Sequence, residues 1–200
     1  MERKKSVNKR KYSRRQQVGK EQIIELLKLF YTYNQLGDLK NEKKVIEKIL
    51  AIEEKYHVIE SYQIALALIR LGIIYGKLGD PIKQKELIER ALAIEETHYG
   101  TEHSEVAKTL VLLGNAHGNL GDHQKKKELL KQALAIFEKL LGTEHFQVAD
   151  TLVHLANAYG RLGNAKLQKK LLERALAIKE KHYGTEHFEV ADTLVHLANA

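Results

Sequence analysis

Residues 142–158 read GTEHFQVADTLVHLANA, and residues 184–200 read GTEHFEVADTLVHLANA. The two stretches differ only in that Gln147 is replaced by Glu189, and the same GTEH tetrapeptide also begins at Gly100. The three starts are separated by 42 residues. A fixed period of this length is typical of a solenoid, in which small supersecondary units stack in series and each unit contacts mainly its neighbours.

The period divides most of the chain into equivalent units. We predict three full repeats at residues 58–99, 100–141 and 142–183, preceded by a degenerate repeat at 16–57 and followed by a partial repeat at 184–200. Because the last stretch corresponds to only the first helix of a repeat, we expect the natural protein to continue beyond it.

Each unit has the pattern of two helices joined by a tight turn. In residues 142–183, apolar residues recur at helical spacing from Val148 to Tyr159, and a second stripe runs from Leu167 to Ile178. The turn residues Gly163 and Asn164, between the stripes, tolerate the left-handed conformation that ends a helix. The sequence therefore predicts an all-α protein built of stacked antiparallel helix pairs.

The spacing within the unit distinguishes families whose repeats have similar lengths, such as HEAT and armadillo repeats. Large, large, small, aromatic, turn-glycine and small residues follow one another as in the tetratricopeptide repeat (TPR) signature. The residues that carry this resemblance are Leu68, Leu71, Gly72, Tyr75, Gly79 and Ala91, then Leu110, Leu113, Gly114, His117, Gly121 and Ala133, then Leu152, Leu155, Ala156, Tyr159, Gly163 and Ala175. The 42-residue period and the GTEH connector look like the kinesin-light-chain type of TPR. The resemblance covers residues 16–200 and implies a right-handed superhelix.

One position departs from the TPR pattern. Early in the second helix, where TPR proteins carry a small residue, this chain has Glu42, Gln84, Lys126 and Gln168. We expect the helix contact at this position to be looser or offset.

The resemblance also implies a binding surface, because the first helices of TPR proteins line a concave groove. The groove residues, carried over position by position, are Arg70, Lys77, Lys108, Asn115, Asn119, Asp150, His154, Asn157, Arg161 and Asn199. Asn115, Asn157 and Asn199 recur at one position, and a ladder of carboxamides can donate to and accept from an extended peptide. The alternative interpretation is that these asparagines are solvated helix residues. The resemblance thus predicts a protein–protein interaction scaffold that binds a peptide or protein partner in its groove.

No set of residues indicates catalysis or metal binding. The chain has no cysteine, and its glycines recur as repeat punctuation instead of forming a phosphate loop between a strand and a helix. His103, His145 and His187 occupy the same connector one repeat apart, whereas zinc needs three or four convergent ligands. We therefore predict that these histidines pack or cap the connectors, that the protein is not an enzyme, and that it needs no metal or other cofactor.

The net charge of +7 is concentrated in residues 1–15, which hold eight Lys or Arg and one Glu, so that residues 16–200 carry 25 basic and 25 acidic side chains. A segment with so few apolar residues is expected to form a disordered tail. Its cations can contact a polyanion such as nucleic acid, an acidic protein or an anionic membrane. They are Arg3, Lys4, Lys5, Lys9, Arg10, Lys11, Arg14 and Arg15. An adaptor that acts through this tail, and a regulatory or sensor region of a longer multidomain protein, are the alternatives to groove binding.

The composition bears on location as well. No stretch has the roughly 18–20 uncharged apolar residues of a membrane span, and no apolar signal-peptide region follows the basic N-terminus. The absence of cysteine suits a reducing compartment. We expect a cytoplasmic protein, with a nuclear location as the alternative if the source is eukaryotic.

Overall fold

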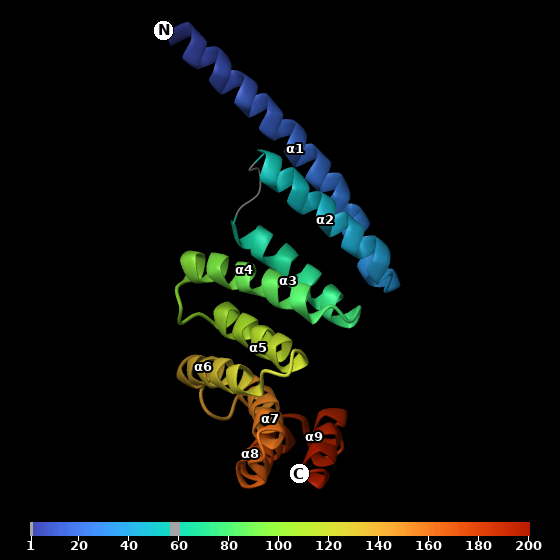
Figure 1. Ribbon diagram of the computed structural model, residues 1–200, viewed down its shortest axis with the longest axis vertical. Coiled ribbons are helices and arrows are strands. Elements are labelled where there is room, and N and C mark those ends of the chain that lie inside the picture. Colours follow the sequence, from blue (N-terminus) through green and yellow to red (C-terminus); the bar gives the residue numbers. More distant parts are fainter. Residues whose placement is uncertain (1, 57–60) are drawn as a thin grey trace.

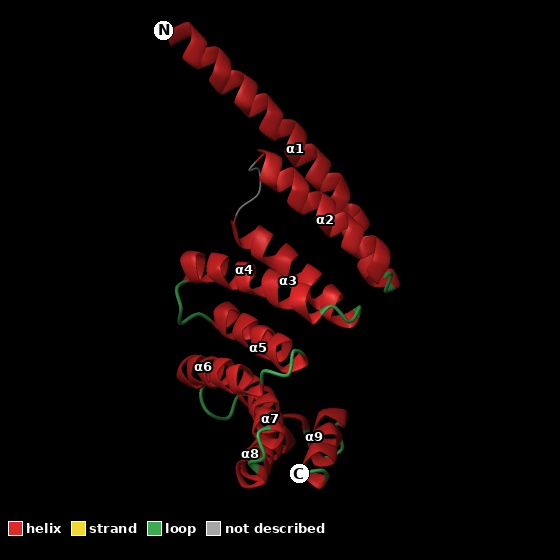
Figure 2. Cartoon of the chain, in the orientation of Figure 1, coloured by secondary structure: helices red, strands yellow, loops and turns green. Residues whose placement is uncertain are grey.

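The computed structural model describes the backbone of residues 2–56 and 61–200, and the side chains of residues 16–56 and 62–200. Within these residues all regular structure is helical, as the sequence predicted (Figure 2). The helices are α1 (Glu2–Leu36), α2 (Leu39–Tyr56), α3 (Ser61–Lys77), α4 (Pro81–Tyr99), α5 (Ser104–Asn119), α6 (His123–Leu141), α7 (Phe146–Arg161), α8 (Ala165–Tyr183) and α9 (Phe188–Ala198).

The helices pack as antiparallel pairs that follow one another along the long axis, with the two chain ends at opposite ends of the molecule (Figure 1). Each first helix (α1, α3, α5, α7) packs most extensively on the second helix of its own pair (α2, α4, α6, α8), and each second helix contacts the next first helix. The α2–α3 junction is the least extensive of these contacts. This series of pairs is the solenoid that the 42-residue period indicated.

The turns and connectors have the chemistry that their sequences predicted. Gly163, after α7, has a φ of 77°, which a residue without a Cβ adopts at little cost. Asn164 then caps α8, and its Oδ1 accepts a hydrogen bond from the backbone N–H of Leu167 at 3.1 Å. These local signals fix where one helix ends and the next begins.

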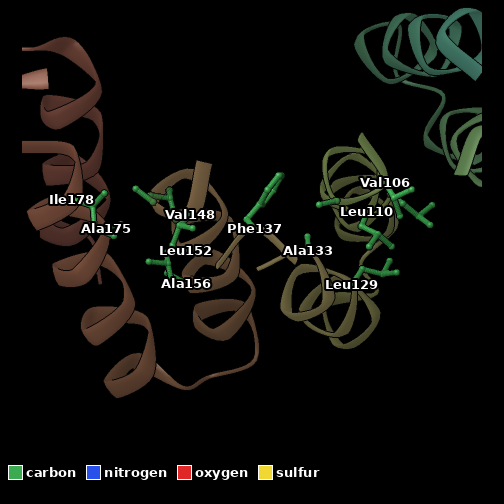
Figure 3. Packing of buried hydrophobic residues seen from close by; sticks show 14 of the residues in the cluster. Val106, Leu110, Leu129, Ala133, Phe137, Val148, Leu152, Ala156, Ala175 and Ile178 are labelled. Atoms are coloured by element: carbon green, nitrogen blue, oxygen red, sulfur yellow. The ribbon is translucent and has the colours of Figure 1, made fainter. Parts of the chain in front are cut away.

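The largest hydrophobic cluster runs without a break through the middle of the solenoid. It joins residues of α4 to α8, including Val106 of α5, Phe137 of α6, Leu152 of α7 and Ile178 of α8 (Figure 3). All four side chains are buried. A smaller cluster of Ile23, Val45 and Ile49 lies within the α1–α2 pair alone. In the central cluster each helix shares its apolar residues with its neighbours, so stacking supplies much of the burial that stabilises these pairs.

At Gln84, Lys126 and Gln168 the contact early in the second helix is not looser as expected, because a small residue in the first helix compensates for the long one. The glycines at 76, 118 and 160 lie opposite the long side chains at 84, 126 and 168. A Cβ built at Gly118 would lie 2.7 Å from Cδ of Lys126, and one at Gly160 would lie 2.3 Å from Oε1 of Gln168. The helices therefore pack closely while a long polar side chain passes between them.

The N-terminal segment also differs from the expectation of a disordered tail, since α1 is helical from Glu2 onwards. Lys, Arg and Gln are favourable helix residues, and no glycine or proline precedes Gly19, so a helix fixed against α2 can extend backwards. A Cβ at Gly19 would lie 3.0 Å from the ring of Tyr56, the last residue of α2. The helix before Gly19 therefore projects past the end of α2 (Figure 1).

Candidate functional site

The main candidate site is a polar pocket of about 730 Å³, called here the amide–cation pocket. It lies where the ends of the first helices α5, α7 and α9 meet the starts of the second helices α6 and α8. It therefore draws on three consecutive repeats. The lining residues are Gly118, Asn119, Gly121, His123, Lys126, Asn157, Gly160, Arg161, Gln168, His196 and Asn199.

Four of the ten predicted groove residues line this pocket: Asn119, Asn157, Arg161 and Asn199. Asn157 and Asn199 are equivalent residues of consecutive repeats, so two steps of the predicted asparagine ladder are brought together. Asn115, the third member, is partly buried on α5 and does not line the pocket.

Arg70, another predicted groove residue, is held by the preceding repeat. Its Nε donates to Glu42, whose carboxylate is fully buried, and its Nη2 donates to Asn34 Oδ1 at 2.5 Å. One junction further on, the amide of Asn119 donates to Gln84 Oε1 at 3.1 Å. Gln84, which passes beside a first-helix glycine, thus reaches the same surface as the predicted groove residue Asn119.

The remaining charged positions are spread along the solenoid. Lys77 is exposed at the end of α3. Lys108 Nζ lies 2.7 Å from the carboxylate of Glu105 on its own helix. Asp150 Oδ1 lies 2.8 Å from Nζ of Lys179, a lysine that is itself only 2% exposed.

His154 is partly buried on α7, near the pocket but outside its lining. Burial lowers the pKa of its imidazole to about 4, and the positive charge of Lys126 acts in the same direction. The ring is therefore neutral at physiological pH.

Sequence reasoning missed Lys126, Gln168, His123 and His196 as lining residues. His196 lies 42 residues after His154, so the repeat itself was a sufficient signal. Lys126 and Gln168 stand at a position that the TPR pattern reserves for packing. Only the glycines opposite them reveal that their polar ends pass through to the pocket.

The electrostatics of the pocket favour an anion. Burial lowers the pKa of Lys126, and the nearby charge of Arg161 lowers it further. Among the described residues, neither cation has an ion-pair partner, and no carboxylate lines the pocket. The buried Nδ1 of His123 also has no hydrogen-bond partner among the described residues.

The connector histidines have the capping role that was predicted for them. Nδ1 of His103, His145 and His187 accepts the backbone N–H two residues later, at 3.2, 3.2 and 3.3 Å. The ring of His187 also stacks on Tyr183 with centroids 4.6 Å apart. Across the described residues, no group of three or more His, Cys, Asp or Glu is placed to hold a metal ion.

A smaller, apolar pocket of about 350 Å³ lies at the thin α2–α3 junction. Leu27 and Tyr31 of α1 and Leu66 of α3 contribute exposed apolar surface to its lining.

Across the same part of the chain that the structure describes, no helix is long and apolar enough to cross a membrane.

Comparison with protein families matches the tetratricopeptide repeat over residues 63–139 and again over residues 105–181. The chain belongs to the tetratricopeptide repeat family. Comparison with curated protein sequences gives no match.

The TPR array is of the kinesin-light-chain-like type. It resembles the crystal structure of the Q17M form of a putative kinesin light chain from Podosopora anserina, described as having nearly identical TPR-like repeats. The TM-score is 0.73 with 27% identity, over 88% of this chain and 84% of that one. BtubC (BKLC) from P. vanneervenii shares the fold with a TM-score of 0.74 and 19% identity, over 94% and 82% of the chains. MamA shares it with a TM-score of 0.61 and 20% identity, over 86% and 87%.

Proposed function

We propose that this TPR array is a non-enzymatic scaffold that binds a polypeptide partner along the surface formed by α5, α7 and α9. The observation that carries the proposal is the amide–cation pocket, because it draws equivalent residues from consecutive repeats into one site. A chain lying across the repeats meets Asn157 and then Asn199, and each carboxamide can pair with one peptide unit.

The partner is proposed to bind in an extended conformation. Stacked repeats present the same side chain at regular intervals, which suits a ligand whose own groups are regularly spaced. The amides and cations that line the pocket give orientation and specificity, while the close packing of the first helices on the second helices keeps the surface rigid.

The test uses the full chain as bait in affinity capture, compared with a variant in which Asn115, Asn157 and Asn199 are all changed to Ala. We expect partners bound by the wild type to be lost from this variant. The matched control changes three exposed second-helix residues, Gln132, Lys169 and Glu173, to Ala and is expected to keep them. Partners that survive the asparagine changes, or that are lost equally from both variants, contradict binding at this surface.

The basic helix at residues 2–15 supports a second candidate function, contact with a polyanion. It concentrates the net charge of the chain on a helical segment that projects past α2. Changing its eight Lys and Arg to Gln preserves helix propensity and removes the charge. If this segment carries the binding, the change abolishes a strongly salt-dependent interaction, whereas groove binding is unaffected and less sensitive to salt.

A further inference from the structure

We propose that the amide–cation pocket binds a phosphorylated side chain of the partner polypeptide, with the phosphate held between Lys126 and Arg161. The inference rests on the proposed function and names the chemistry that the site selects.

The charge of the pocket is the first argument. Two other cations of this surface meet carboxylates of the protein: Arg70 meets Glu42, and Lys179 meets both Asp150 and Glu189. Lys126 and Arg161 line one pocket together, and no described residue forms an ion pair with either. Two uncompensated positive charges match the charge of about −2 on a phosphorylated side chain, whereas a single carboxylate neutralises only one of them.

The lining donors are the second argument. A phosphate group presents three strong acceptor oxygens, and Arg, Lys and amide N–H groups are the donors that suit them. Asn157 and Gln168 add carboxamides that no hydrogen bond within the described residues engages. The unpartnered Nδ1 of His123 adds a further group whose hydrogen-bonding capacity is unused.

The rigidity of Lys126 is the third argument. Its stem passes beside Gly118 so closely that a Cβ there would lie 2.7 Å from Cδ. Part of the conformational entropy that a surface lysine would lose on binding is therefore already lost in the folded protein. A lysine held in this way beside an arginine is preorganised for an anion.

The size of the pocket distinguishes between sources of phosphate. A volume of about 730 Å³ falls in the range of sites that take ligands of many atoms. A free phosphate ion would leave most of that volume to water, whereas a phosphorylated residue with its flanking backbone reaches the asparagines as well. We therefore assign the phosphate to a polypeptide.

The experiment measures binding of the full chain to three degenerate peptide libraries with a fixed central residue: phosphoserine, glutamate or serine. Inorganic phosphate is titrated separately by calorimetry. We expect the phosphoserine library to bind at least about tenfold more tightly than the glutamate library, because each charge-assisted hydrogen bond gained corresponds to about a tenfold change in affinity.

The test variant is Lys126→Gln with Arg161→Asn. Equivalent positions of neighbouring repeats already carry Gln84 and Asn119, so this pair of changes is compatible with the fold. The control, Lys125→Gln with Lys166→Asn, removes the same charge from exposed residues outside the lining. We expect the test variant to lose at least about tenfold in affinity for the phosphoserine library and the control to retain it.

Four results overturn the inference: equal affinity for phosphoserine and glutamate, equal loss in both variants, phosphoserine binding that survives the test variant, or inorganic phosphate binding as tightly as phosphopeptide. Failure of the proposed scaffold function gives a different result from failure of phosphate recognition. If captured partners are lost with the asparagine variant but survive Lys126→Gln with Arg161→Asn, groove binding stands and phosphate recognition fails. If partners survive both variants, the scaffold surface itself is wrong.

Discussion

Residues 146–158 in α7 and residues 188–200, which begin with α9, have the same sequence apart from Gln147 and Glu189, yet they lie in different surroundings. Val148 and Val190 are both buried, because α7 packs on α6 and α9 packs on α8 in the same way. On the other face the copies diverge: Leu152 is fully buried against α8, whereas Leu194 is 45% exposed. An amphipathic helix is thus encoded locally, but the stabilisation that its apolar face provides depends on its neighbours.

The largest expected effect is a difference between equivalent leucine truncations. Leu152→Ala removes a fully buried side chain and should lower the free energy of unfolding by about 2–5 kcal/mol. Leu194→Ala should cost less than about 1 kcal/mol, since much of its side chain is already in water. Denaturant unfolding followed by circular dichroism measures both, and equal losses would show that α9 is packed as fully as α7.

The single sequence difference between the copies gives a second comparison. Lys179 Nζ lies 2.7 Å from Oε2 of Glu189 and 2.8 Å from Oδ1 of Asp150. Burial alone would lower the pKa of this lysine, but the hydrogen bonds and charges of the two carboxylates outweigh burial and raise it. Glu189→Gln makes the two copies identical and should cost about 1–2 kcal/mol, because one partner of a buried charge becomes neutral.

The control for this change is the reciprocal one, Gln147→Glu. The position equivalent to Lys179 in the preceding repeat is the buried Phe137, which offers no charge to a carboxylate. Gln147→Glu should therefore give no stabilisation. Hydrogen exchange of the α9 amides, compared with those of α7, reports where the loss occurs, and a neutral Glu189→Gln would argue against the ion pair.

A third comparison uses pH. His154 has its pKa lowered by burial to about 4 from the ordinary value of 6.5, so between these values the unfolded chain binds a proton that the folded chain does not. The contribution of neutral His154 to the stability of the folded protein is complete above pH 6.5 and is lost as the pH falls towards 4. His154→Leu, which copies Leu112 of the preceding repeat, should reduce the loss of stability between pH 7 and pH 4.5 by about 2 kcal/mol, allowing for the partly buried ring.

Unfolding midpoints of the wild type and of His154→Leu across this pH range provide the measurement. If the unfolding midpoints of the two proteins change in parallel from pH 7 to pH 4.5, the lowered pKa of His154 does not contribute to the pH dependence of stability.

The smallest effect is expected two repeats before Lys179, where Glu95 takes the equivalent position. Burial raises the pKa of Glu95, a hydrogen bond from Thr109 partly opposes this, and its Oε2 is buried without a hydrogen-bond partner. An acid with a raised folded-state pKa destabilises the protein above its ordinary value of 4.5, and the penalty disappears as the pH falls below it.

Glu95→Gln should therefore stabilise the protein by about 0.5–1 kcal/mol at pH 7 and by nothing near pH 4. Thermal unfolding at the two pH values distinguishes this from a general packing gain. A gain of the same size at both values would mean that the charge of Glu95 is not responsible.

Much of the fold follows from residues close together in the sequence. Gly163 and Asn164 indicate their turn, and the spacing of the connector histidines predicts a packing or capping role for them. Each of these features depends on hydrogen bonds that span a few residues.

The candidate site could be predicted only in part. Asn157, Arg161 and Asn199 followed from the resemblance to TPR proteins. Lys126 did not, because its role depends on Gly118 of the preceding helix and on Arg161 of the next repeat. The resemblance predicts Arg70 as a groove residue, but its ion pair with Glu42, 28 residues earlier, depends on how two repeats stack.

By itself the sequence determined the helical repeat, its 42-residue period, the turns, and the apolar stripe of each helix, because backbone hydrogen bonds and side-chain periodicity act over a few residues. Only the tertiary structure decided which stripes are covered on both sides and which charges find a partner. Burial and Coulomb interactions depend on atoms that the stacking brings close from positions tens of residues away. The two copies of one sequence, in α7 and α9, separate these contributions within a single chain.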